Sequence, residues 1–184
     1  LVALACQHLF NEVLVEYGSA PNGLCQVIIG MAEQGTQLVE DGRIPLISAT
    51  GSTRMGRAVG PKVAARFGRS LLELGGNNAM IITESADLAV AIPSILFGSV
   101  GTAGQRCTST RRVIVHRSII DKVFDTLKQA YLSIGEEKIG SPLEAGTLVG
   151  PVIDQPAFDG MQMALDAIRP EAVEIVGGER ALAD

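Results

Sequence analysis

Apolar positions along the chain fall into two alternating patterns, helical spacings and short continuous runs. Apolar residues at helical spacing predict six helices, over Leu1 to Val15, Thr36 to Glu40, Arg54 to Phe67, Asp87 to Val100, Ser118 to Ile134 and Gln155 to Ile168. Short apolar runs ended by turn residues predict six strands, at residues 25–29, 44–47, 70–74, 79–83, 112–115 and 173–176. Thr36 is expected to cap the second helix, and Ser118 the fifth.

This alternation predicts an α/β protein in which helices cover a parallel sheet. Ligands of such sheets bind beyond the carboxyl ends of the strands, which here are Gly30, Thr50–Gly51 and Glu73–Gly75. The pair Gly75–Gly76 is the best candidate boundary between two domains, at residues 1–75 and 76–184.

Composition narrows the class of protein further. Hydrophobic residues make up 47% and charged residues 19% of the 184 positions, so a sizeable core is possible and global disorder is excluded. The net charge of −5 with no basic stretch argues against a nucleic-acid partner. Apolar runs fall short of the roughly 18 residues that cross a bilayer, so no membrane-spanning segment is expected.

Cysteine usage indicates a reduced, intracellular chain. Three widely spaced residues, Cys6, Cys25 and Cys107, give no C-x-x-C spacing, and no acidic cluster is present, so neither a disulfide framework nor a metal site is expected. No targeting pattern is visible at the N-terminus, which favours the cytoplasm, with the mitochondrial matrix as the alternative. The chain opens on Leu1 within an apolar stretch, so we expect it to be part of a longer protein.

Cys107 is the strongest candidate for chemistry. Its neighbours are small or polar, Arg106 could favour a thiolate, and Gly101 and Gly104 leave the backbone open to a ligand. The alternative is a small buried hydrophobic side chain, which is the interpretation kept for Cys6 and Cys25 because they lie on apolar elements.

Two further segments lie at carboxyl ends of predicted strands. Glu73 could act there as a general base, although a solvent-facing strand position is the simpler interpretation. Residues 51–56 follow a strand and open a helix, whose free N–H groups attract phosphate, although an ordinary capped turn has the same pattern. Neither His8 nor His116 is placed beside Cys107, which a cysteine-dependent hydrolase or acyltransferase would require.

Three blocks, taken in order, resemble the aldehyde dehydrogenase superfamily. They are Ile47 to Thr53, Leu72 to Asn77, and Gly104 to Thr108, and Cys107 follows Glu73 by 34 positions, as in that family. The amino-acid sequences of the segments from Phe67 to Ala79 and from Gly101 to Thr108 are most similar to the antiquitin branch, the α-aminoadipic semialdehyde dehydrogenases. The resemblance covers essentially the whole chain but only the middle of a family member. It implies that residues 1–75 are the C-terminal part of a Rossmann-like NAD-binding domain and residues 76–184 the N-terminal part of an α/β catalytic domain.

The resemblance implies oxidation of a small semialdehyde with NAD, or NADP, as acceptor. Cys107 matches the family nucleophile, which forms a thiohemiacetal and then a thioester, and Glu73 matches the base that activates water. The Cys107 N–H matches half of the oxyanion hole. Arg106 and Thr108 match positions that hold the substrate's distal carboxylate. Cofactor-binding positions match at Gly35, Thr36, Gly51, Ser52, Thr53, Arg54, Met55, Gly56 and Leu74.

The match has departures. Ala49 stands where the family usually has an aromatic residue, and the first cofactor-binding strand and the oxyanion Asn are expected upstream of Leu1. A longer parent protein is expected to be a homo-oligomer. The alternative function is a truncated, catalytically silent α/β module that acts only by associating with itself or with a partner.

Overall fold

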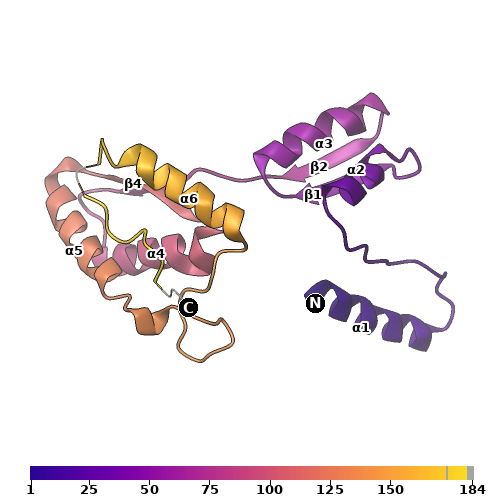
Figure 1. The fold of residues 1–184 in the computed structure, drawn as a ribbon, viewed down its shortest axis with the longest axis horizontal. Coiled ribbons are helices and arrows are strands. Elements are labelled where there is room, and N and C mark those ends of the chain that lie inside the picture. Colours follow the sequence, from indigo (N-terminus) through magenta and orange to yellow (C-terminus); the bar gives the residue numbers. More distant parts are fainter. Residues whose placement is uncertain (173, 182–184) are drawn as a thin grey trace. The chain divides into compact units, whose positions relative to one another are not determined.

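The computed structural model describes residues 1–172 and 174–181, and the chain divides into two compact units, Leu1–Glu73 and Leu74–Asp184 (Figure 1). Helices alternate with parallel strands in both units, which confirms the predicted α/β class. None of the described helices has the length and apolar character needed to cross a membrane.

The first unit contains a two-stranded parallel sheet and a helix that connects its strands. Its elements are α1 (Val2–Tyr17), α2 (Ala32–Glu40), β1 (Leu46–Thr50), α3 (Thr53–Ala65) and β2 (Arg69–Glu73). The register pairs Leu46 with Arg69 and Thr50 with Glu73, so the two strands end at the same edge. Val39 of α2 and Val63 of α3 are its buried hydrophobic side chains among the described residues.

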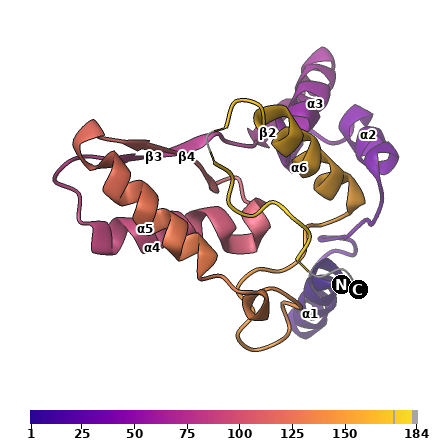
Figure 2. The same cartoon turned by 60° about the vertical axis from the view of Figure 1, so that its left-hand side comes forward.

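The second unit has a second parallel pair covered by two helices. Its elements are β3 (Asn78–Ile82), α4 (Leu88–Val100), a 3-10 turn (Gly101–Gly104), β4 (Thr110–Val115), a 3-10 turn (Arg117–Ile119), α5 (Ile120–Leu132), a 3-10 turn (Glu136–Lys138) and α6 (Gln155–Ile168). Figure 2 shows α4 and α5 side by side against the strands.

The core of this unit follows from strand alternation. Ile82 faces inward from β3 and packs with Ile92 and Ile95 of α4 and Val123 of α5. Met80, two positions before Ile82, packs against the same cluster, whereas Ile81 between them is exposed. Side chains on a strand alternate between faces, so the inner face also carries Asn78 at the start of β3.

A register shift interrupts the ladder where β3 begins. Asn78 pairs with Thr110, but the next residue, Ala79, pairs with Arg112, so Arg111 is the extra residue of a bulge. Bulges bend a strand locally and change the direction of nearby side chains. This irregularity lies at the strand ends next to the segment that carries Cys107.

Two predictions for the first unit, a strand at residues 25–29 and the start of the second helix, are wrong. Residues 25–29 form no strand, because no described segment pairs with them and a strand requires a hydrogen-bonded neighbour. The second helix begins at Ala32 rather than Thr36, since the Gln34 side chain accepts the Met31 N–H at 2.9 Å and closes the first turn earlier.

The cap predicted for the fifth helix and the last predicted strand also need correction. His116 Nδ1, not the Ser118 hydroxyl, accepts a backbone N–H at the turn before α5, from Ser118 at 3.3 Å. Of the strand predicted at 173–176, residue 173 lies outside the described residues, and residues 174–176 are not in a strand.

Candidate active site

Cys107 lies on an exposed tight turn between the 3-10 turn Gly101–Gly104 and β4. The Ser109 N–H donates to the Arg106 carbonyl at 3.1 Å and closes the turn. The Ser109 hydroxyl accepts the Arg106 N–H, also at 3.1 Å. The Asn78 amide donates to the carbonyls of Cys107 at 2.7 Å and Ser109 at 3.1 Å. The turn is therefore held on both sides by hydrogen bonds.

The Cys107 N–H donates to no residue that the structure describes, and the same holds for the Thr108 N–H, although the carbonyls of Arg106 and Cys107 both accept hydrogen bonds. A backbone N–H beside a nucleophile, with no partner of its own, can donate to an oxygen that becomes negatively charged on the carbon under attack.

The backbone before Cys107 is strained. Thr102 and Ala103 have φ of 54° and 52°, and Gly104 has φ of 72°. The first two are not glycine, and left-handed backbone costs such residues roughly 1–2 kcal/mol each. Residues held in such conformations occur often at functional sites.

The Gln105 side chain connects this segment to a distant loop. Its Nε2 donates to the carbonyls of Thr102 at 3.0 Å and Pro151 at 3.3 Å, while its Oε1 accepts the Ile153 N–H at 2.8 Å. The sequence motif around Cys107 contains Gln105, but no local pattern indicates these partners, which lie 46 and 48 positions further on.

Arg106 folds back onto the end of α4. Its Nη2 donates to the Phe97 carbonyl at 3.0 Å, and the guanidinium carbon lies 5.0 Å from the centre of the Phe97 ring. A cation at a helix C-terminus is favourable there. A Cβ at position 101 would clash with this guanidinium, so Gly101 leaves the room that Arg106 occupies.

The start of α3 presents free backbone donors. The Ser52 hydroxyl caps the helix by accepting the Met55 N–H at 3.1 Å, and Gly56 is buried. The amides of Thr53 and Arg54 donate to no described group. Such a helix start can bind an anionic group such as a pyrophosphate.

Glu73 ends β2 at the same sheet edge as that helix start. Its carbonyl accepts the Gly51 N–H at 3.0 Å, so the strand ladder continues one residue beyond β1. Its side chain is exposed and makes no hydrogen bond or ion pair with a described residue. Glu73 therefore has a carboxylate that is free to bind water.

The remaining predicted positions are placed as follows. Gly35 and Thr36 lie within α2, and the Gly35 N–H already donates to the Met31 carbonyl at 3.2 Å, so they do not begin a helix. Leu74 is half-buried at the start of the second unit, and Thr108 is exposed on the Cys107 turn.

The other cysteines differ from expectation. Cys6 and Cys25 were expected to be buried, but both are exposed, because α1 and the 25–29 segment bury none of their side chains in the described structure. His116 follows β4 at the end opposite Cys107, and a strand of six residues spans roughly 20 Å. His116 therefore does not serve Cys107 as a base.

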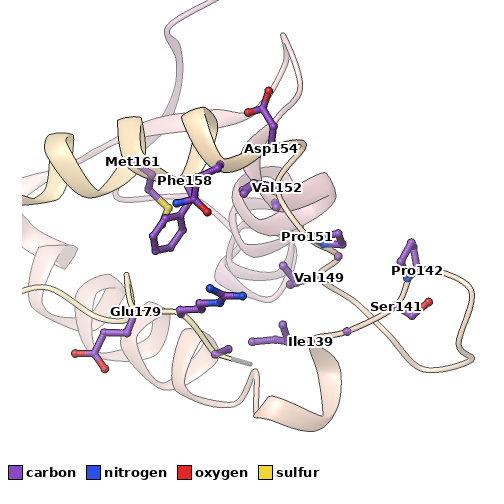
Figure 3. Close-up of a pocket in the computed structure, with 16 residues that line it drawn as sticks. Ile139, Ser141, Pro142, Val149, Pro151, Val152, Asp154, Phe158, Met161 and Glu179 are labelled. Carbon is purple, nitrogen blue, oxygen red and sulfur yellow. The ribbon is translucent and has the colours of Figure 1, made fainter. Parts of the chain in front are cut away.

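A cavity of about 730 Å³ lies elsewhere in the second unit. Figure 3 shows Phe158 and Met161 extending from α6 on one side of it and Ile139 and Val149 on the other. Ala103 also contributes to its wall, but Cys107 does not. Among the described residues no cluster of three or more His, Cys, Asp or Glu side chains could hold a metal ion.

Comparison with known proteins identifies the family. The aldehyde dehydrogenase family model matches residues 1–184. The chain is 49% identical over 157 residues to a Caenorhabditis elegans homolog of aldehyde dehydrogenase family 7 member A1, covering 85% of this chain and 29% of that protein. It is 42% identical over 182 residues to the α-aminoadipic semialdehyde dehydrogenase of Bos taurus, covering 99% and 33% respectively.

The fold agrees with the sequence match. Betaine aldehyde dehydrogenase from Staphylococcus aureus, in a crystal structure with NAD⁺, superposes with a TM-score of 0.84 at 31% identity, over 93% of this chain and 34% of that one. The chain thus spans about a third of the length of the relatives it matches. The match along the whole sequence and the shared fold show that this chain belongs to the aldehyde dehydrogenase family.

Proposed function

We propose that the chain is the central part of an NAD(P)-dependent aldehyde dehydrogenase that oxidises a semialdehyde to a carboxylate through Cys107. The observation that supports this most directly is the Cys107 turn, which combines an exposed thiol with a neighbouring N–H that has no described partner. Relatives named α-aminoadipic semialdehyde dehydrogenase support the substrate class.

In this mechanism the Cys107 thiolate attacks the aldehyde carbon and forms a thiohemiacetal. The Cys107 N–H donates to the oxygen as it becomes negative, and a single such donor contributes roughly 3 kcal/mol. Loss of hydride from this adduct leaves a thioester on Cys107. Covalent capture replaces one difficult oxidation by two easier steps.

Glu73 is proposed to accept a proton from the water that hydrolyses the thioester. Its exposed carboxylate has no described partner, as a base that binds water requires. In the sequence, only four residues separate Glu73 from Asn78, whose amide holds the Cys107 carbonyl. The product carboxylate then leaves, and the thiol is restored.

The nicotinamide cofactor supplies the acceptor for the hydride when it is bound. The pyrophosphate of the cofactor is proposed to bind at the start of α3. The Thr53 and Arg54 amides have no described partner there, and the Ser52 hydroxyl caps the helix. The family's other cofactor contacts are proposed at Gly35, Thr36 and Leu74.

Arg106 and Thr108 are proposed to bind the distal carboxylate of the semialdehyde. Arg106 Nη2 donates to the Phe97 carbonyl, and the buried Nε has no hydrogen-bond partner among the described residues. A guanidinium group offers several donors in a fixed plane, so it can keep the Phe97 contact and still donate to a carboxylate.

A titration of NAD⁺ tests this function against a silent module. The melting temperature of the 184-residue chain should rise saturably with NAD⁺, because a ligand that binds only the folded state stabilises it. Addition of a short semialdehyde should then produce NADH. No shift with NAD⁺ up to millimolar concentration, and no NADH, would favour the module.

The Glu73→Gln variant separates the two chemical steps. We expect acylation of Cys107 to continue and hydrolysis of the acyl group to slow by ~10²-fold or more, because the base is lost. Glu84→Gln is a matched control, since Glu84 is an exposed carboxylate that lies 3.9 Å from His116 Nδ1, and His116 follows β4 at the end opposite Cys107. Equal hydrolysis rates in both variants would exclude Glu73 as the base.

A further inference from the structure

Two side chains that the proposed mechanism does not use hold the Cys107 turn. We propose that Asn78 and Ser109 are positioning residues that fix the direction of the Cys107 N–H, so that it points at the oxygen of a bound carbonyl compound. This inference rests on the proposed function, because it concerns the same nucleophile. Neither residue is expected to touch the substrate.

The peptide groups of the turn are fixed one after another. Ser109 Oγ holds the Arg106 N–H, and the Ser109 N–H holds the Arg106 carbonyl. That carbonyl and the Cys107 N–H belong to the same planar peptide group and point in opposite directions. Fixing the Arg106 carbonyl therefore fixes the direction of the Cys107 N–H.

Asn78 fixes the following peptide group. Its Nδ2 donates to the Cys107 carbonyl at 2.7 Å and to the Ser109 carbonyl at 3.1 Å, so one amide group spans both sides of the turn. Rotation of the peptide group between Cys107 and Thr108 would break the hydrogen bond from Asn78 to the Cys107 carbonyl. We call the Ser109 hydrogen bonds and the Asn78 hydrogen bonds the two clamps of the turn. They fix the peptide groups on either side of Cys107, whose N–H has no described partner, as is also true of the Thr108 N–H.

The surroundings of both residues suit this role. Ser109 is only 2% exposed, and a polar side chain buried to that degree is normally kept for its hydrogen bonds. Asn78 lies at the bulge where β3 begins, which sets its direction. A Cβ at position 76 would come within 3.0 Å of the Cys107 carbonyl and 2.8 Å of Asn78 Oδ1, so Gly76 gives the clamp its space.

The fixed direction of the Cys107 N–H should affect the rate of some reactions of the thiol and not others. A donor that already points at the developing negative charge needs no reorganisation during the reaction. If the clamp is removed, the N–H samples other directions, and only reactions that build an oxyanion should slow. Reactions of the same thiol that build no oxyanion should keep their rate.

Two reagents distinguish these reactions. Iodoacetamide alkylates the thiolate by forming a carbon–sulfur bond as iodide leaves, with no oxyanion. p-Nitrophenyl acetate acylates it through a tetrahedral oxyanion, which collapses to a thioester as p-nitrophenolate leaves. Both rates depend on the thiolate fraction, so their ratio cancels any change in the thiol's ionisation.

The variants are made in the 184-residue chain with Cys6→Ser and Cys25→Ser, so that Cys107 is the reacting cysteine. Asn78→Leu removes the amide donor at nearly constant size. Asn77→Leu is the matched control, because Asn77 is the exposed neighbouring residue and only its backbone carbonyl is used, by Arg112 at 2.7 Å. Ser109→Ala tests the second clamp and replaces Asn78→Leu if that variant does not fold.

The chain with only Cys6→Ser and Cys25→Ser is the parent of these variants. Its ratio of acylation rate to alkylation rate should exceed that of N-acetylcysteine by ~10-fold or more. Asn78→Leu and Ser109→Ala should lower the ratio by ~10-fold with alkylation nearly unchanged, and Asn77→Leu should leave it as in the parent. A raised parent ratio that survives Asn78→Leu and Ser109→Ala would overturn the clamp alone. A parent ratio equal to that of N-acetylcysteine would overturn the oxyanion donor and with it the proposed function.

Discussion

The two units present their candidate chemistry in different ways. In the first unit the groups belong to the backbone at a helix start and to one exposed carboxylate, and the buried hydrophobic side chains of the described part are Val39 and Val63. In the second unit the thiol lies on a turn held by the side chains of Asn78 and Ser109, and four buried hydrophobic residues form the core of the unit. A helix start can bind an anion with few supporting contacts, whereas orienting a nucleophile requires a supporting shell.

The largest expected effect comes from the thiol itself. Cys107→Ala should lower acyl transfer from p-nitrophenyl acetate by ~10³-fold or more, because loss of a nucleophile removes the covalent route. Stopped acylation with an unchanged melting temperature is the predicted result. The matched variants Cys6→Ala and Cys25→Ala, at cysteines that are also exposed, should keep the rate of the unsubstituted chain. Equal losses of acyl-transfer rate in all three variants would contradict the assignment of the nucleophile to the second unit.

Core truncation compares the packing of the units. Ile95→Ala, at a residue 1% exposed in the second unit, should lower the free energy of unfolding by about 2–5 kcal/mol, measured by urea denaturation. Val63→Ala in the first unit removes fewer methyl groups and should cost about 2 kcal/mol. Ile114→Ala is the control, because Ile114 is exposed on β4 and its truncation should cost less than either.

Removal of the Ser52 cap of α3 should lower the free energy of unfolding by less than the core truncations. Ser52→Ala should cost about 1 kcal/mol of stability, since Met55 loses its hydroxyl acceptor. It should also weaken NAD⁺ binding, because the helix start becomes less ordered. Ser70→Ala, at an exposed serine of β2 whose hydroxyl makes no hydrogen bond to a described residue, should change neither quantity measurably.

The smallest effect concerns an exposed ion pair of the first unit. Hydrogen bonds from the Arg43 side chain and backbone lower the pKa of Asp41 from 3.8 to about 2. Because the folded pKa is depressed, the stability it contributes is present above pH 3.8 and is lost as the pH falls through about 2.

Arg43→Gln should return the pKa of Asp41 toward 3.8 in an NMR titration of its side-chain carboxyl carbon. Lys62→Gln, which breaks the neighbouring pair with Glu40, should leave the Asp41 titration as in the parent chain. An Asp41 pKa that stays near 2 in Arg43→Gln would show that another group holds the carboxylate.

The sequence predicted most elements because their signals are local. Helical spacing and a serine cap are enough to place α3, and short apolar runs place β1 to β4 within a few residues. It failed at residues 25–29, where an apolar run has no strand to pair with, and at Thr36, where the Gln34 side chain closes the helix earlier. A propensity is overridden wherever a partner decides the outcome.

The same distinction between local signals and distant partners applies to the candidate site. Cys107, Glu73 and the start of α3 could be selected from strand ends and short motifs. The roles of Asn78 and Gln105 could not, because Asn78 binds residues 29 and 31 positions away, and Gln105 binds Pro151 and Ile153, 46 and 48 positions away. No period or motif encodes such contacts. The exposure of Cys6 and Cys25 was missed for a similar reason, since burial depends on what packs against an apolar element.

The most direct test of the account is the site of acylation in the unmodified chain. The protein is treated with less than one equivalent of p-nitrophenyl acetate, and the acetyl group is located by peptide mapping at low pH. All three cysteines are exposed, so accessibility alone would label them alike. The account predicts acetyl on Cys107 in large excess over Cys6 and Cys25, and equal labelling of the three would contradict it.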